Sequence, residues 1–394
     1  MKSRVLLGMS GGIDSTVSAL LLLEQGYEVV GVTFRTFDSI KESCLRREKG
    51  CCSVESIMEA RENARKMGFE HHIVDFRDIF RDKVISNFID EYMSGRTPNP
   101  CVLCNSFIKW GELLRLADEL GCEKIATGHY ARIAERKGHL YLRRAADVKK
   151  DQTYFLWRLT EENLRRTLFP LGDITKEQVR DIARQHGYEK LAVKAESQEI
   201  CFVTDNDYRS FLRENVADYD KRVHEGAFVD AERKRLGTHC GFPNYTIGQR
   251  KGLGIALGKP VYVTDINAQE NIVALGDYND LYRQSVRVAD FRVRDAQWLT
   301  DDPTCMAMIR YRSKPQKAEV KCRLSSTENI LSSTENILSS TENTERTENL
   351  LTNAGNSNGE DVELVFDNPV WAAAPGQSAV LYKDDLLVGG GVIY

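Results

Sequence analysis

Apolar and polar residues follow one another in the first half of the chain as strands followed by helices would. The apolar run 4–9 leads into the turn SGGIDS, and a stretch with helical apolar spacing then ends at Gly26. The alternation continues as strand 28–34, helix 54–68, strand 71–76, helix 78–94, a helix opening near Asn105, and strand 123–133. Alternating strands and helices of these lengths predict an α/β fold with a parallel sheet covered on both faces.

The pattern changes beyond about residue 206. Turn-rich stretches separate short alternating runs such as KPVYVTDI, CMAMIRYRS and VELVFDNP, which predict antiparallel sheet or a small β-barrel. We expect a catalytic α/β domain at 1–206, a small linking domain at 207–274 and a C-terminal antiparallel β-barrel at 275–394. Within the barrel, 324–361 is a low-complexity seven-residue repeat with one apolar position, too little for a coiled coil. We predict a flexible insertion without a catalytic role.

Composition narrows the class of protein. No run approaches the roughly 20 apolar residues of a membrane span, and the first residues lead into a glycine loop, not a signal peptide. We therefore expect a cytoplasmic protein without membrane association, whose 10 cysteines are mostly reduced thiols. The net charge of −4 argues against a generally basic nucleic-acid binder. Residues 132–166 nevertheless hold ten Lys/Arg against five Asp/Glu, and 233–251 hold five against none. These stretches are either local basic surfaces or ordinary solvated faces.

The turn SGGIDS has the composition of a phosphate-binding loop. Its two glycines let backbone N–H groups approach an anion, the helix end adds about half a positive charge, and Ser10 and Ser15 can donate to phosphate oxygens. Asp14 beside the phosphates is expected if Mg²⁺ bridges them. The motif lacks the GK[ST] ending of a Walker loop, and alone it could be a tight strand-to-helix turn. Its place after the first strand of an α/β sheet favours nucleotide binding.

SGGxDS in this place resembles the signature of the PP-loop ATP pyrophosphatases, which split ATP between its α- and β-phosphates and adenylate a carbonyl oxygen. The order of further motifs resembles that of bacterial tRNA-uridine 2-sulfurtransferases: TPNPCVLCNSFIKW, ATGHYAR, KKDQTYFL, FPLGDITKEQVR, ESQEICF, YTIGQRKGLGI, RYR and APGQSAV. The likeness covers nearly the whole chain except the repeat. It implies an adenine nucleotide alpha hydrolase-like catalytic domain, a tRNA-binding role for 207–274, and ATP-dependent 2-thiolation of the wobble uridine of tRNA, with ATP and Mg²⁺ as cofactors.

The resemblance also implies site residues. For ATP they are Gly8, Met9, Ser10, Gly11, Gly12, Ile13, Asp14, Ser15, Phe34 and Gly128. For tRNA and its target base they are Asn99, Pro100, Cys101, His129, Lys150, Asp151, Gln152, Arg310, Tyr311 and Gln377. The target base must leave its stack to react, and Lys149 and Tyr154 suit phosphate binding and base stacking. Tyr154 and His129 could instead be core residues. We expect a monomer that takes sulfur from a cysteine desulfurase or a sulfur-relay protein.

Such a reaction needs a sulfur carrier. The C2 carbonyl of uracil is a poor electrophile, so adenylation must turn its oxygen into part of a good leaving group, AMP, before a cysteine persulfide delivers sulfur. By resemblance, Cys201 bears the persulfide, and Cys104 activates or cleaves it and is left in a disulfide with Cys201. A helix starting near Asn105 would lower the pKa of the Cys104 thiol.

Cys101 departs from the commoner form of the family that the chain resembles, which has aspartate there as a potential general acid or base. With Cys101, Cys104 and Cys201 in one site, three thiolates would repel one another unless a persulfide or a metal neutralised them. A four-iron four-sulfur cluster with one open iron, as in related cluster-dependent tRNA thiolases, is therefore an alternative to the persulfide route. Cys44, Cys51 and Cys52 could bind zinc, but we expect them to bind nothing.

Two other classes of protein remain as alternatives. A PP-loop ligase that adenylates a small carboxylate, such as argininosuccinate synthetase, would need neither paired thiols nor an RNA-binding barrel. A non-enzymatic iron–sulfur or nucleotide-binding scaffold would show no pyrophosphate turnover with or without tRNA.

Overall fold

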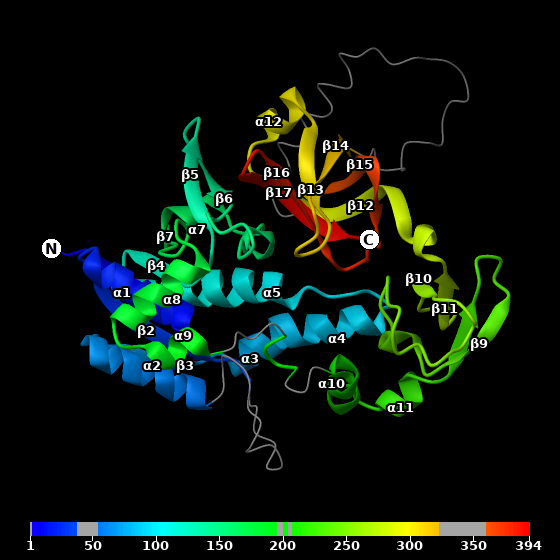
Figure 1. The fold of residues 1–394 in the computed structure, drawn as a ribbon, viewed down its shortest axis with the longest axis horizontal. Helices are drawn as coiled ribbons and strands as arrows, with labels where there is room; N and C mark the ends of the chain where they lie inside the picture. The colour runs from blue at the N-terminus through cyan, green and yellow to red at the C-terminus, as the bar shows by residue number, and fades with distance from the viewer. Residues whose placement is uncertain (1, 38–53, 195–199, 204–206, 323–359) are drawn as a thin grey trace. The chain divides into compact units, whose positions relative to one another are not determined.

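The computed structural model describes residues 2–37, 54–194, 200–203, 207–322 and 360–394. They form two units: Met1–Asp90 with Asn99–Tyr219, and Glu91–Pro98 with Asp220–Tyr394 (Figure 1). Cys44, Cys51 and Cys52, and all but the last two residues of the repeat 324–361, lie outside the described residues. None of the described helices is long and apolar enough to cross a membrane.

The first unit contains a parallel sheet of five strands in the order β3-β2-β1-β4-β7. This arrangement confirms the predicted α/β fold. Its strands are β1 (Arg4–Gly8), β2 (Glu28–Arg35), β3 (His71–Asp75), β4 (Lys124–Thr127) and β7 (Thr167–Leu168). The first unit also contains the antiparallel hairpin of β5 (Arg132–Arg136) and β6 (His139–Arg143).

Helices cover both faces of this sheet. Val5 and Leu7 of β1 pack with Ala19 of α1 and Ala60 of α2 on one face. Gly8 faces the other way, because a Cβ added to it would lie 3.8 Å from Leu113 of α6. The helices are α1 (Ile13–Glu24), α2 (Val54–Met67), α3 (Arg77–Phe80), α4 (Ser86–Met93), α5 (Pro100–Leu103), α6 (Leu113–Glu119), α7 (Glu161–Arg165), α8 (Lys176–Gln185), α9 (Glu189–Val193) and α10 (Tyr208–Asn215), with π-helical turns at Arg81–Ile85 and Cys104–Glu112 and a 3₁₀ turn at Thr153–Phe155.

Two predicted element boundaries are wrong. The strand predicted over 123–133 ends at Thr127, where the chain turns at Gly128 before β5 begins at Arg132. The helix predicted to open near Asn105 already starts at Pro100, whose fixed φ and missing N–H suit the first position of a helix.

The second unit contains a mixed four-stranded sheet, β10-β11-β8-β9, and an antiparallel barrel of six strands, β12-β15-β14-β13-β16-β17. Pairing of β12 with β17 closes the barrel and confirms the predicted C-terminal fold. The elements are β8 (Gly226–Val229), β9 (Arg235–His239), β10 (Tyr262–Asn267), β11 (Ile272–Gly276), β12 (Tyr282–Val293), β13 (Thr304–Met308), β14 (Gln316–Cys322), β15 (Glu360–Trp371), β16 (Ser378–Lys383) and β17 (Leu386–Ile393), with α11 (Tyr219–Arg222), α12 (Ala296–Asp301) and 3₁₀ turns at Phe242–Asn244 and Tyr278–Leu281.

A short segment from the first half of the chain, Glu91–Pro98, belongs to the second unit. The Thr97 N–H donates to Pro375 O at 2.7 Å, and Gln377 Nε2 donates to Thr97 O at 3.1 Å and to Pro98 O at 2.9 Å. A Cβ on Gly376 would lie 2.6 Å from Thr97 O, so this close approach requires glycine. The barrel therefore fixes the residues that directly precede α5.

Candidate active site

The loops that follow β1 and β4 meet at the carboxyl edge of the parallel sheet. β1 lies between β2 and β4, so the strand order reverses at this point, and such reversals leave a crevice beyond the strand ends. Gly8 is paired with Thr127, and a Cβ on Gly128 would lie 3.1 Å from the Asp14 carbonyl carbon. The structure thus brings Gly128 directly against the predicted phosphate loop.

The loop Met9–Gly12 has a backbone shape that depends on glycine. Gly11 has φ +74°, and a Cβ on it would lie 2.2 Å from Ser56 O at the start of α2. The Ser15 hydroxyl donates to Gly12 O at 3.0 Å, so this serine holds the loop's own backbone in place. The first N–H groups of α1 have no acceptor within the helix, which is the usual basis of anion binding at such an end.

Asp14, in the first turn of α1, contacts two side chains from later in the chain. Its carboxylate accepts hydrogen bonds from Lys176 Nζ at 2.8 and 2.9 Å and from the Tyr130 hydroxyl at 2.8 Å. The Lys176 side chain is 7% exposed, and that of Asp14 is 34% exposed. A lysine therefore neutralises the carboxylate that the sequence predicts beside Mg²⁺.

Sequence reasoning missed Lys176, although a signal was present. Thr175 and Gln178 form a reciprocal capping box that starts α8, which places Lys176 at the first helical position. A cation is unfavourable at this positive end of a helix, so a lysine there indicates a specific anionic partner.

His129 lies in the interior, next to the phosphate loop. It is 8% exposed; its Nδ1 lies 2.8 Å from Thr127 Oγ1, and its Nε2 lies 3.4 Å from Lys109 Nζ. Burial, and then the charge of Lys109, hold its pKa well below the ordinary histidine value. The imidazole is therefore neutral near pH 7, with Nε2 free to accept from the lysine. Its expected contact with tRNA stays a prediction, and Lys109 is a second cation that the sequence analysis overlooked.

The two thiols of the CxxC motif lie on one helical segment. Cys101 is in the first turn of α5, and Cys104 follows three residues later, a spacing that puts both side chains on the same face. The Cys101 side chain is exposed to solvent, but many protein atoms surround it. Desolvation by these atoms raises the pKa of the Cys101 thiol, and the charge of Lys109 acts in the opposite direction. Because the helix starts at Pro100 and not near Asn105, its positive end is closer to Cys101 than to Cys104.

Cys201 is positioned by its neighbour Phe202. The Phe202 ring packs against Phe80 of α3 at 5.7 Å, Phe88 of α4 at 5.1 Å and Phe211 of α10 at 5.2 Å between centroids. The α3 helix in turn contacts the π-helical turn that begins at Cys104. This aromatic cluster therefore ties the chain at Cys201 to the same group of helices as the CxxC segment.

The donor set for a cluster is not assembled. Among the residues that the structure describes, no three His, Cys, Asp or Glu side chains are grouped so that they could hold a metal ion. Cys101, Cys104 and Cys201 form no disulfide with any cysteine that the structure describes. The arrangement does not fit the three-cysteine ligand set of the iron–sulfur alternative, and we derive no step through a cluster.

Two side chains of the predicted RNA-binding loop 149–152 form hydrogen bonds with residues outside the loop. Asp151 accepts from the Ala145 N–H at 3.0 Å and from the Thr153 hydroxyl at 2.7 Å, and burial raises its pKa against the effect of these bonds. Gln152 Oε1 accepts from the Tyr130 N–H at 2.9 Å. Tyr154 is fully buried, so the prediction that it stacks on a base is wrong and the core interpretation holds.

Three of the predicted tRNA-contacting residues, Arg310, Tyr311 and Gln377, lie in the second unit. The Arg310 guanidinium stands 5.6 Å from the Trp371 ring centroid and donates to Ile247 O at 2.9 Å. Tyr311 has the guanidinium of Arg312 over its ring at 5.2 Å. Gln377 holds Thr97 and Pro98, as described above. Their contacts with an anticodon arm stay predictions.

Comparisons with known proteins cover the whole chain. Residues 3–205 match a family model described as the tRNA methyl transferase HUP domain, residues 210–277 the tRNA methyl transferase PRC-barrel domain, and residues 345–393 the aminomethyltransferase β-barrel domain. The chain is 45% identical to the tRNA-specific 2-thiouridylase MnmA of Amoebophilus asiaticus, over 100% of this chain and 95% of that protein. It is 45% identical to MnmA 3 of Bacteroides fragilis and 44% identical to MnmA of Carboxydothermus hydrogenoformans, over 100% of this chain and 94% and 98% of those proteins.

Proposed function

Because the chain belongs to the tRNA-specific 2-thiouridylase family, we propose that it replaces the C2 oxygen of the wobble uridine in tRNA with sulfur in an ATP-dependent reaction. The observation that supports this most is the combination, in the first unit, of a glycine-rich phosphate loop at the switch point of a parallel sheet with two thiols on the α5 segment. A small-carboxylate ligase has no use for these thiols. A scaffold has no use for an Asp14–Lys176 pair whose lysine is buried.

The first step is adenylation. The loop Met9–Gly12 and the N-terminus of α1 bind the phosphates of ATP, and the C2 oxygen of the uracil attacks the α-phosphate so that pyrophosphate leaves. Asp14 can supply an oxygen ligand to Mg²⁺, which would neutralise charge on the phosphates. Lys176, which pairs with Asp14, supplies a second positive charge at the same place.

The second step is sulfur transfer. Cys201 carries a persulfide received from a donor such as a cysteine desulfurase or a sulfur-relay protein. The Cys104 thiolate attacks Sγ of Cys201 and releases hydrosulfide, which adds to C2 and expels AMP, while the two cysteines are left in a disulfide. A reductant must then restore the two thiols before the next turnover. Cys104 directly follows α5, the helix that starts at Pro100.

A reconstituted reaction tests the proposal. Purified chain, tRNA, ATP and a cysteine desulfurase with ³⁵S-cysteine should yield pyrophosphate and labelled 2-thiouridine, whereas S-adenosylmethionine in place of ATP should yield no methylated base. Asp14→Asn should abolish pyrophosphate release but leave tRNA binding intact. Asp118→Asn, which removes a carboxylate paired with Arg166 at the surface of the same unit, is the matched control. Undiminished pyrophosphate release by Asp14→Asn, or methyl transfer by the wild type, would overturn the proposal.

A further inference from the structure

Two hydrogen-bonded routes join the predicted RNA-binding loop 149–152 to Asp14 at the start of α1. The first begins at Asp147, just before the loop. Its Oδ1 accepts from the Lys149 N–H at 3.1 Å, and its Oδ2 accepts from the Lys176 N–H at 3.0 Å. Lys176 Nζ in turn donates to both carboxylate oxygens of Asp14. The Asp147 carboxylate therefore bridges the loop and the residue that holds Asp14.

The second route starts at the other end of the loop. Gln152 Oε1 accepts from the Tyr130 N–H at 2.9 Å, and the Gln152 N–H donates to Tyr130 O at 2.9 Å. The Tyr130 hydroxyl donates to Asp14 at 2.8 Å. Lys176 Nζ also lies 5.7 Å from the centroid of the Tyr130 ring, within the range of a cation–π contact. Both routes therefore end at the same carboxylate.

Buried contacts surround the two routes. Tyr130 belongs to one hydrophobic cluster with Ile13 of α1 and Val179 of α8, and Lys176 itself is buried. Close-packed interiors transmit small displacements because they contain little free volume. A movement of the loop therefore shifts the side chains that hold Asp14.

The outer side of the same stretch is open to solvent. Val148 is 68% exposed, and Lys149 is exposed as well. Asp147 and Gln152, in contrast, are bonded to the protein on the inner side. A lysine on such an outer surface suits an RNA phosphate, and the backbone N–H of this lysine is the group that Asp147 holds.

We propose that Asp147 and Tyr130 are positioning residues that couple tRNA on the loop to the nucleotide at Asp14. The proposal rests on the proposed function, which supplies both ligands. When an RNA phosphate binds at Lys149, the Asp147 carboxylate follows the Lys149 N–H, and the start of α8 moves with it. Lys176 then turns from Asp14 toward the phosphates of ATP, which leaves the carboxylate open to a cation such as Mg²⁺. Each ligand therefore strengthens the binding of the other.

The test is equilibrium binding of α,β-methylene-ATP, which cannot release pyrophosphate, by the full chain with and without tRNA. Coupling between two sites typically changes affinity by about 5- to 150-fold, so saturating tRNA should lower the Kd of the analogue by about 5-fold or more. Linkage requires that the analogue lower the Kd of tRNA by the same factor.

Two variants each interrupt one route. Asp147→Asn leaves one acceptor oxygen where the carboxylate has two, so it cannot accept from both Lys149 and Lys176. Tyr130→Phe removes only the hydroxyl that meets Asp14 and keeps the backbone contacts with the loop. Each single variant should reduce the coupling factor, and the double variant should remove the coupling.

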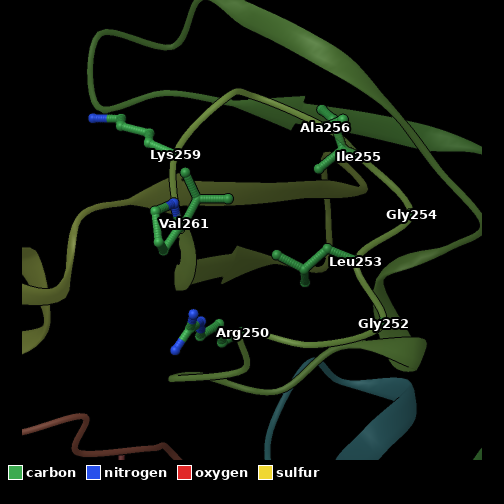
Figure 2. A pocket seen from close by; sticks show the side chains of 9 residues that line it. Arg250, Gly252, Leu253, Gly254, Ile255, Ala256, Lys259 and Val261 are labelled. Atoms are coloured by element: carbon green, nitrogen blue, oxygen red, sulfur yellow. The ribbon is translucent and has the colours of Figure 1, made fainter.

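Two further variants are controls. Asp181→Asn removes an exposed carboxylate from the same helix, α8, where it pairs with Arg184, and should keep the wild-type coupling factor. Arg250→Ala is the control for affinity alone. Arg250 lines a pocket of about 420 Å³ in the second unit (Figure 2), within the stretch to which the resemblance gives a tRNA-binding role. This variant should keep the coupling factor even where its tRNA affinity falls.

Each outcome decides the proposal. Loss of coupling in the route variants but not in the controls, with melting temperatures near that of the wild type, supports it. Undiminished coupling in the double variant, an equal loss in either control, or wild-type affinities that do not depend on each other would overturn it and leave the proposed function standing. A wild-type chain that binds neither tRNA nor nucleotide would overturn the proposed function as well. If Asp147→Asn does not fold, Tyr130→Phe still decides.

Discussion

The pair Asp14–Lys176 leads to an asymmetric prediction for two single substitutions. At 2.8 Å and an effective dielectric constant of about 20, the attraction between the two charges is about 6 kcal/mol, most of it offset by the desolvation of both groups. The charged group that stays behind in each variant differs in its access to water, because the Asp14 side chain is 34% exposed and that of Lys176 only 7%. Asp14→Asn removes the charge of Asp14 while the Lys176 ammonium stays buried, which costs about 3 kcal/mol. Lys176→Met leaves a carboxylate that water can reach and that Tyr130 still contacts, at about half that cost.

Calorimetric unfolding of the four members of the double-mutant cycle measures these costs. For a unit of this size, about 1 kcal/mol shifts the melting temperature by about 2–4 °C, so Asp14→Asn should lower the transition of the first unit about twice as far as Lys176→Met. The double variant should be more stable than the sum of the two losses predicts, by at least about 1 kcal/mol. The exposed pair Asp118–Arg166 is the control, and its coupling should be below about 1 kcal/mol. Additive losses at Asp14 and Lys176, or equal single losses, would refute this account of the site.

Three further predictions concern sulfur, protons and the barrel. In Cys101→Ala, Cys201 should still accept ³⁵S from a desulfurase, whereas Cys104→Ala should block transfer to tRNA; loss of bound iron and of all thiolation in Cys101→Ala would favour the cluster instead. Burial, with His72 and Arg61 nearby, lowers the pKa of His71 to about 4. The unfolded chain therefore takes up this proton first, and stability should fall as the pH drops from about 6.5 toward 4, less steeply in His71→Gln; an unchanged pH slope would contradict this. Gly376→Ala should lower the barrel's melting temperature by several degrees more than Gly258→Ala, where a Cβ meets only open space, and equal shifts would show that the contact with Thr97 is unimportant.

The parallel sheet was predictable because its strands are continuous apolar runs and its helices have clear spacing. The end of β4 was not predictable, because ATGHYAR is apolar enough to be interpreted as a strand that continues past Gly128. Only the packing of Gly128 against Asp14 explains the turn. The π-helical turn at Cys104–Glu112 likewise has no signature in the local sequence.

The site was predictable where local backbone chemistry defines it, as in the phosphate loop and the CxxC segment. It was not predictable where a long-range contact defines it. Lys176 meets Asp14 across 162 residues, and Lys109 in the π-helical turn meets His129 just after β4. For Tyr154 the sequence leaves both interpretations open, because a tyrosine a few residues after two lysines suits RNA stacking as well as a core, and only the three-dimensional packing separates the two.

The place of Glu91–Pro98 in the second unit affects how the protein can be made. Gln377, which donates a hydrogen bond to Thr97 O, is synthesised 280 residues after Thr97. At about 5–20 residues per second, a ribosome needs tens of seconds to synthesise the chain between them. During that interval the stretch leading into the cysteine-bearing helix has no barrel to hold it. A nascent chain can therefore complete its nucleotide loop early, but the entry to its thiol helix becomes fixed only once the last strands have emerged.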